Sequence, residues 1–184
     1  MLPLVYENFE NEADLAVTNN GHTVQFKLNT NPMPTITGGP LLGKYKFMQF
    51  HFHWGAHDEE GSENQVNSHS FPMELHVVFY STAYGTFENA TQHPDGLCVV
   101  SFLYSKSEED NENYNQIINL LPRVNEVGNS AKGIDPIVLE LLLTEDKEHY
   151  YTYGGSLTTP PCTEDVTWIE FKSTIPLSHK QVGI

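Results

Sequence analysis

Three histidines occur in two short stretches of the sequence with a spacing that suits a metal site. His51 and His53 lie two residues apart in residues 45–54, and His76 lies in residues 73–80. Side chains two apart on a β-strand point to the same face, so pairing these segments as strands brings the three imidazoles together. Zinc binds neutral imidazole readily, and a catalytic zinc has three protein ligands and a fourth position for water. His51, His53 and His76 are the predicted ligands.

Two polar residues precede the predicted ligands at the same spacing. Gln49 lies two residues before His51, and Glu74 lies two residues before His76. A ligand histidine needs a partner on its second ring nitrogen, which an amide or a carboxylate supplies. One histidine on an apolar strand is more often a hydrogen-bonded core residue than a ligand. Three histidines with two such partners favour the metal site.

The length and hydropathy of the chain predict one domain over residues 1–184. A chain of 184 residues buries roughly 70% of its unfolded surface and builds a core of its own. The longest apolar stretches, residues 97–104 and 137–143, are far shorter than the roughly 18 residues that cross a bilayer. The N-terminus lacks the basic start and the apolar region of a signal peptide. We expect no membrane span in this chain.

The chain is strongly acidic. It has 9 Lys and Arg against 24 Asp and Glu, a net charge of −15, which makes nucleic acid and anionic membranes poor partners. The acidic runs at residues 7–14, 58–63, 108–112 and 145–148 are typical of solvated loops, with calcium or mineral association as the alternative. Five further histidines stand among polar residues and are expected on the surface: His57, His69, His93, His149 and His179.

Alternation and turn residues predict mostly strands. They are expected at residues 22–28, 45–54, 73–80, 97–104, 150–153 and 166–172, with a turn at residues 19–21 and a loop at residues 31–40. Residues 137–143 are ambiguous. Apolar residues recur at helical spacing in residues 113–127, where Pro122 kinks or ends the helix. The fold class is mainly β (α+β), a large, mostly antiparallel twisted sheet with short peripheral helices.

A last motif is the turn at residues 155–161, where Ser, Thr and Thr stand between Gly and Pro-Pro and a hydroxyl is held in place. With Gln-Phe-His-Phe-His-Trp-Gly at 49–55, Gly-Ser-Glu at 61–63, Glu-Leu-His-Val-Val at 74–78 and Val-Thr-Trp at 166–168, in this order, the chain resembles an α-class carbonic anhydrase. The motifs are very specific in combination, and the resemblance covers nearly the whole chain.

The resemblance implies a zinc enzyme that hydrates CO2 reversibly to bicarbonate and a proton, by attack of zinc-bound hydroxide. Thr158 would accept the hydroxide proton and donate its own to Glu63, and His22 would be the proton shuttle. Imidazole suits that task because it titrates near neutrality. The remaining implied residues are the water network of Asn20 and Gln25 and the substrate pocket of Val78, Val99, Leu157, Thr159, Val166 and Trp168. We expect CO2 and bicarbonate as the ligands and a monomer.

The family's domain is longer at both ends, so the chain is expected to be a partial domain. In the family, the ligand matched by His53 is held by a main-chain carbonyl of the missing C-terminal stretch. Extracellular members pair a cysteine at the position of Cys162 with one near the N-terminus, whereas Cys98 looks like a core residue. Together with the glycosylation sequon at Asn89, this favours a secreted full-length parent over a cytoplasmic one.

Two other function classes stay open. A metal oxidoreductase is one, because His51 and His53 with Asp58 or Glu59 suggest a cupin, and the same pair with His69 and His76 loosely suggests a superoxide dismutase. A chain that binds zinc weakly and serves as an acidic matrix or interaction module is the other. Neither oxidoreductase arrangement accounts for Thr158 and Glu63. The second class is an inactive or weakly zinc-binding, truncated member of the family, and because all zinc ligands and Thr158 are present, its inactivity would have to come from truncation.

Overall fold

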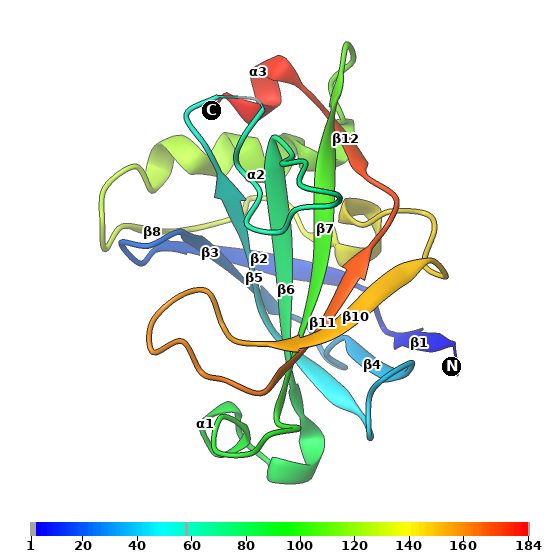
Figure 1. Cartoon of the computed structure of the whole chain (residues 1–184). Helices are drawn as coiled ribbons and strands as arrows, with labels where there is room; N and C mark the ends of the chain where they lie inside the picture. The colour runs from blue at the N-terminus through cyan, green and yellow to red at the C-terminus, as the bar shows by residue number, and fades with distance from the viewer. Residues whose placement is uncertain (1–2, 58, 184) are drawn as a thin grey trace.

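A large twisted sheet dominates the computed structural model, which describes residues 3–57 and 59–183 (Figure 1). The path through the sheet runs β10-β11-β7-β6-β5-β3-β2-β8, and further strands pair at its margins. The strands are β1 (Leu4–Glu7), β2 (Glu12–Asn19), β3 (Val24–Asn29), β4 (Thr35–Gly38), β5 (Tyr45–Trp54), β6 (Met73–Ser81), β7 (Leu97–Ser107), β8 (Ser130–Lys132), β9 (Ile137–Val138), β10 (Tyr150–Gly155), β11 (Val166–Phe171) and β12 (Ile175–Ser178).

Most strand pairs are antiparallel. The centre of the sheet pairs β5 with β6 and β6 with β7 in this way, whereas β7 runs parallel to both β11 and β12. The predicted mainly β fold with a mostly antiparallel sheet is therefore confirmed, and the two parallel pairs make the sheet mixed. All six predicted strands form, and their ends differ from the prediction by a few residues.

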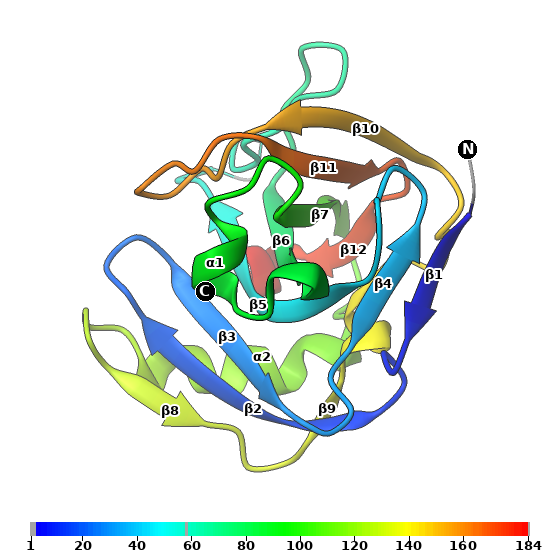
Figure 2. The same ribbon diagram turned by 90° about the horizontal axis from the view of Figure 1, so that it is seen from below.

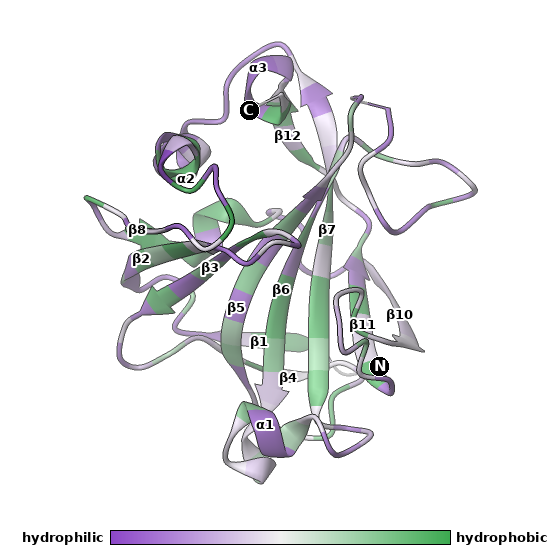
Figure 3. Ribbon diagram, turned by 90° about the vertical axis from the view of Figure 1, so that its left-hand side faces the viewer, coloured by the Kyte–Doolittle hydropathy of each residue, from purple (hydrophilic) through white to green (hydrophobic). Residues whose placement is uncertain are grey.

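Short helices surround the sheet: η1 (Thr82–Tyr84), α1 (Phe87–Ala90), η2 (Glu112–Tyr114), α2 (Asn115–Leu120), η3 (Leu121–Arg123), η4 (Leu139–Leu142) and α3 (His179–Val182). The predicted helix at residues 113–127 becomes the run from η2 to η3 and ends at Arg123, one residue after Pro122. The α1 helix lies at one end of β6 and β7 and α3 at the other (Figures 1 and 3). No helix in the described residues is long and apolar enough to cross a membrane.

Two apolar clusters form on the sheet. The main core gathers most of the buried aromatic residues, among them Phe26 and Phe50, whose rings stack with centroids 4.9 Å apart. The second cluster contains Val78, Val99 and Trp168. Figure 3 shows apolar stretches along β5, β6 and β7, while the connecting loops are mostly polar. The central strands are therefore covered on both faces.

An irregularity in β5 sets the direction of its side chains. The pairing with β6 jumps from Phe47 to Gln49, so Met48 is an extra residue, a β-bulge. Before the bulge, odd-numbered side chains such as Phe47 enter the main core; after it, even-numbered ones such as Phe50 do so. The bulge thereby turns His51 and the odd-numbered residues beside it to the opposite face.

Several local predictions need correction. The acidic side chains in residues 7–14 are exposed as expected, but Glu7 ends β1 and Glu12 begins β2, in which buried and exposed positions alternate. The predicted loop at residues 31–40 contains β4. The ambiguous residues 137–143 form β9 and then η4. Asp58, which belongs to one acidic run and to the cupin alternative, lies outside the described residues.

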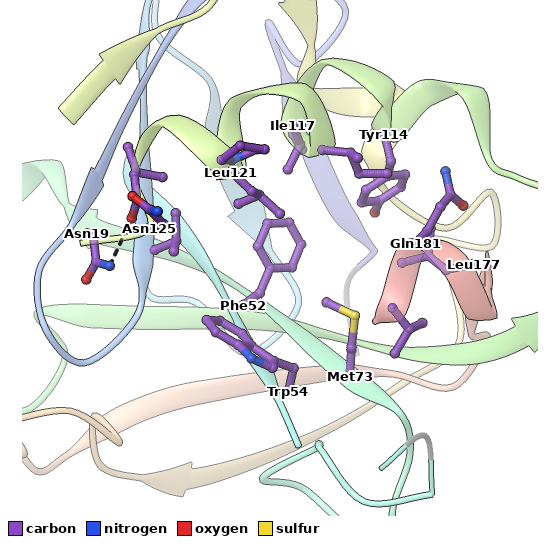
Figure 4. Close-up of a pocket in the computed structure, with 15 residues that line it drawn as sticks. Asn19, Phe52, Trp54, Met73, Tyr114, Ile117, Leu121, Asn125, Leu177 and Gln181 are labelled. Carbon is purple, nitrogen blue, oxygen red and sulfur yellow. Dashed lines mark hydrogen bonds between the residues drawn. The ribbon is translucent and has the colours of Figure 1, made fainter. Parts of the chain in front are cut away.

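An apolar cavity of about 380 Å³ separates α2 and η3 from the sheet (Figure 4). Trp54 and Met73 line it from the sheet, and Ile117 and Leu121 line it from the helical side. None of the three predicted ligands contributes to its lining. The cavity is thus separate from the histidine cluster.

Candidate metal centre

The three predicted ligands converge in the folded chain. His51 on β5 lies directly opposite His76 on β6, and His53 follows on the same face of β5. One nitrogen from each ring lies within 4.8 Å of the others, which is close enough for a single ion. The ring centroids are 4.5 Å apart for His53 and His76 and 5.2 Å apart for His51 and His76. The alternation argument therefore placed all three correctly.

Hydrogen bonds determine which ring nitrogens remain for a metal. Nδ1 of His51 lies 2.8 Å from Oε1 of Gln49, and Nε2 of His76 lies 2.8 Å from Oε1 of Glu74. The Nε2 atoms of His51 and His53 are buried without a hydrogen-bond partner among the described residues. Buried polar atoms are rarely left unpaired, so two orphaned imidazole nitrogens facing a third ring fit a bound zinc.

Burial also keeps these imidazoles neutral, which is the form that binds a metal. Desolvation, followed by the neighbouring His76, lowers the pKa of His51 to about 2 and that of His53 to about 4. Burial is the largest single influence on Glu74 and would raise its pKa, but the hydrogen bond and charge of His76, together with the hydrogen bonds from Ser101 and Asn64, outweigh it and bring the pKa to about 2. The site thus combines neutral imidazoles at His51 and His53 with an ionised carboxylate behind His76.

Glu74 is held by more than His76. The backbone N–H of Asn64 donates to Oε2 of Glu74 over 2.8 Å, and the Asn64 amide and the Ser101 hydroxyl both donate to Oε1 over 2.5 Å. Glu74 and Ser101 are both 0% exposed. Every oxygen of this carboxylate therefore has a partner, which fixes its orientation toward His76.

Sequence reasoning missed a second buried carboxyl group, Glu170 on β11. It is 3% exposed and accepts a 3.0 Å hydrogen bond from the same Asn64 amide that binds Glu74. Burial, followed by the charge of Glu74, raises the pKa of Glu170 to about 8. One signal was available: in Trp-Ile-Glu-Phe an acid interrupts an apolar strand, on the face it shares with Trp168.

Glu63 and Thr158 also meet, as the resemblance implied. Burial, the larger influence, raises the pKa of Glu63, while the nearby Thr158 hydroxyl acts in the opposite direction. Oε1 of Glu63 lies 3.4 Å from Nδ1 of His53, beyond the usual hydrogen-bond distance. The indole N–H of Trp168 donates to the Ser156 carbonyl over 3.1 Å and so anchors the loop that carries Thr158.

The three residues expected along a proton path lie near β3. His22 is exposed in the turn before this strand, and its backbone N–H donates to Oδ1 of Asn20 over 2.9 Å. The same oxygen accepts from the backbone of Thr23, so Asn20 shapes the turn. Gln25 pairs directly opposite His51 and therefore shares its face of the sheet.

The predicted substrate wall comes together as one surface. Val78, Val99, Val166 and Trp168 belong to the second apolar cluster, and Leu157 packs against it. The indole of Trp168 meets the His76 ring edge-on, with centroids 4.8 Å apart. The wall therefore adjoins the metal ligands. Thr159 is half-buried in the loop, and its carbonyl accepts from the backbone N–H of Cys162.

The other predicted residues lie away from this centre. Cys98 is buried and Cys162 is exposed, and the two do not form a disulfide. Asn89 is exposed on α1, so its sequon is accessible. His69 is exposed and stays outside the histidine cluster, which leaves the superoxide dismutase arrangement unformed among the described residues. Where the full-length parent resides stays a prediction.

Comparison with known proteins agrees with the motifs. The family model for eukaryotic-type carbonic anhydrase matches residues 1–183. Human carbonic anhydrase 7 is 41% identical over 180 residues, which are 96% of this chain and 66% of that protein. Mouse carbonic anhydrase 6 is 40% identical over 185 residues, 98% of this chain and 57% of that protein.

Mouse carbonic anhydrase 7 is 39% identical over 170 residues, or 91% of this chain and 63% of the relative. The chain thus spans about 57–66% of the length of these curated relatives. The family uses zinc, and the donor set of His51, His53 and His76 fits that ion. The match over nearly the whole chain, on top of this geometry, shows that the protein belongs to the eukaryotic-type carbonic anhydrase family.

Proposed function

We propose that this chain binds zinc through His51, His53 and His76 and catalyses the reversible hydration of CO2. The observation that carries the proposal is the pair of buried, unpartnered Nε2 atoms facing the third ring. When bound there, zinc supplies a Lewis acid that makes water a nucleophile near neutral pH, for which carbonic anhydrase is itself the standard example.

The residues around the ligands have complementary tasks. In this proposal Thr158 donates its hydroxyl hydrogen to the neighbouring Glu63, so its oxygen accepts a hydrogen bond at the reacting centre and orients an incoming water; the influence of Thr158 on the pKa of Glu63 supports this role. The apolar surface of Val78, Val99 and Trp168 receives CO2, which carries no net charge. Each cycle also releases a proton, which exposed His22 transfers to the solvent.

The decisive experiment measures zinc content and CO2 hydration on the same preparations. We expect one zinc per chain and measurable hydration, and we expect His76→Ala to lose both, because it removes one ligand and one of the partners of the buried Glu74. His69→Ala, which deletes an exposed imidazole outside the cluster, is the matched control and should retain both. A parent chain that holds no zinc after incubation with the metal would refute the proposal.

A second variant separates proton transfer from metal binding. His22→Ala should keep its zinc but hydrate CO2 roughly tenfold or more slowly in dilute buffer, and added imidazole buffer should restore the rate. An unchanged rate in dilute buffer would remove His22 from the proton path.

A further inference from the structure

The buried carboxyl group of Glu170 has no task in the chemistry above, although its surroundings connect it to the metal centre. In the sheet, His76 on β6 lies directly opposite Ser101 on β7, and Ser101 lies directly opposite Glu170 on β11. The three side chains therefore form one row across three neighbouring strands. All three are buried, with 0–3% exposure.

Asn64 joins the carboxyl group of Glu170, at one end of this row, to that of Glu74. Its amide nitrogen Nδ2 carries two hydrogens and has two acceptors, Oε1 of Glu74 at 2.5 Å and Oε2 of Glu170 at 3.0 Å. Its amide oxygen accepts from the hydroxyl of Tyr153 over 2.6 Å. Every polar atom of the Asn64 side chain is thus engaged, and only this orientation of the amide fits all its neighbours.

Glu170 completes this arrangement because it takes the second amide hydrogen. Without an acceptor there, one N–H of the half-buried Asn64 amide would lose its partner in the protein, which favours rotation of the amide away from Glu74. Glu74 would then keep the Ser101 hydroxyl but lose the second donor on the oxygen that also binds Nε2 of His76. The effect of Glu170 would therefore reach His76 through two intervening side chains.

We propose that Glu170 is a positioning residue of the metal centre: by holding the Asn64 amide against Glu74, it keeps Glu74 on the Nε2–H of His76 and so keeps Nδ1 of His76 directed at the metal. This role rests on the proposed zinc site. The raised pKa of Glu170 agrees with it, since a neutral carboxyl beside ionised Glu74 avoids two buried like charges.

The test compares a substitution that keeps a hydrogen-bond acceptor for the Asn64 amide with one that removes it. Glu170→Gln retains a carbonyl oxygen for the Asn64 amide, whereas Glu170→Val removes it and keeps a residue that favours strands. In the metal-free chain, nitrogen-15 NMR follows the exchange of the His76 Nε2 proton with water. We expect Val to accelerate this exchange tenfold or more and Gln to leave it within about threefold of the parent.

Zinc release into a chelator gives the second measurement. We expect the Val variant to release zinc at least about tenfold faster than the parent, at the lower end of the usual effect of groups that support a ligand, and the Gln variant to resemble the parent. Tyr104→Phe is the control, because it removes a buried hydrogen bond to Tyr114 from the same strand as Ser101 but outside the row. Tyr104→Phe should change neither the exchange rate of the His76 Nε2 proton nor the rate of zinc release.

The outcomes separate this proposal from the zinc site on which it rests. The positioning role would be overturned if Glu170→Val and Glu170→Gln changed the proton exchange and the zinc release equally, or if Glu170→Val changed neither. If Glu170→Val does not fold, Asn64→Ala removes the same link, and an unchanged Nε2 proton exchange in that variant would overturn it as well. A parent that holds no zinc, but whose metal-free variants exchange as expected, would refute the proposed function and leave the positioning of His76 intact.

Discussion

At the scale of single residues, the site depends on how buried polar groups are paired. His51 and His53 keep one nitrogen each without a partner, while both oxygens of Glu74 are hydrogen-bonded. An unpaired buried nitrogen is unfavourable in the metal-free chain, and a metal ion removes that penalty. Glu170 adds a further unfavourable group, because its Oε1 has no partner among the described residues.

The raised pKa of Glu170 makes stability depend on pH. Its pKa is about 8 in the folded chain against an ordinary 4.5, so between these values the folded state binds more protons than the unfolded state. Stability from this group is therefore lost as pH rises from 4.5 toward 8, at up to about 1.4 kcal/mol per pH unit. We expect the stability of Glu170→Gln relative to the parent to increase by a few kcal/mol across that range.

Urea unfolding at several pH values measures this difference. Glu126→Gln, at an exposed acid, is the matched control and should show a much smaller trend. A Glu170→Gln curve that runs parallel to that of the parent would show that Glu170 does not hold its proton in the folded chain.

At the scale of elements, the β5 bulge decides whether the histidines reach the site. Strict alternation from Tyr45 would put Phe47 and His51 on one face, yet Phe47 enters the main core and His51 faces the metal side. The extra residue Met48 makes both possible, because it reverses the phase of the side chains between them.

Deletion of Met48 should therefore abolish zinc binding. Without the extra residue, either the histidines or the first aromatic residues of β5 must face the wrong side. We expect bound zinc to fall to background in the deletion variant. Met48→Ala keeps the residue count and should retain one zinc per chain at a cost of about 1–2 kcal/mol in unfolding free energy. Full zinc occupancy in the deletion variant would contradict the role of the bulge.

The sequence predicted the strands that carry the metal ligands better than the strand irregularity and the hydrogen bonds that position them. The histidine spacing placed His51, His53 and His76 correctly because the period of a strand is local. The bulge at Met48 was not predicted, because it is visible only in the pairing of β5 with β6. The hydrogen bond between Asn64 and Glu170 was not predicted for a similar reason. Asn64 lies in a loop and Glu170 on β11, and no local sequence pattern connects two residues so far apart in the chain.

At the scale of the whole molecule, net charge opposes the compact fold. A chain with −15 charges repels itself, and salt screens that repulsion. We expect the melting temperature at pH 7 to rise by about 2–4 °C when NaCl increases from about 10 to about 150 mM, which shortens the screening length from roughly 30 to roughly 8 Å. The same series near pH 4.8, the sequence isoelectric point, is the control and should show little change. A melting temperature that falls with salt at pH 7 would mean that local ion pairs outweigh the repulsion.

The order of the site residues along the chain influences the order in which their contacts form during folding. The three imidazoles come from β5 and β6, which are consecutive strands joined by one loop, whereas Thr158 reaches Glu63 only after β10 has been added. Contacts between near segments close at a lower entropic cost than contacts between distant ones. On a growing chain, the three imidazoles can therefore come together before Thr158, to which the proposed function assigns the orientation of water, has been added.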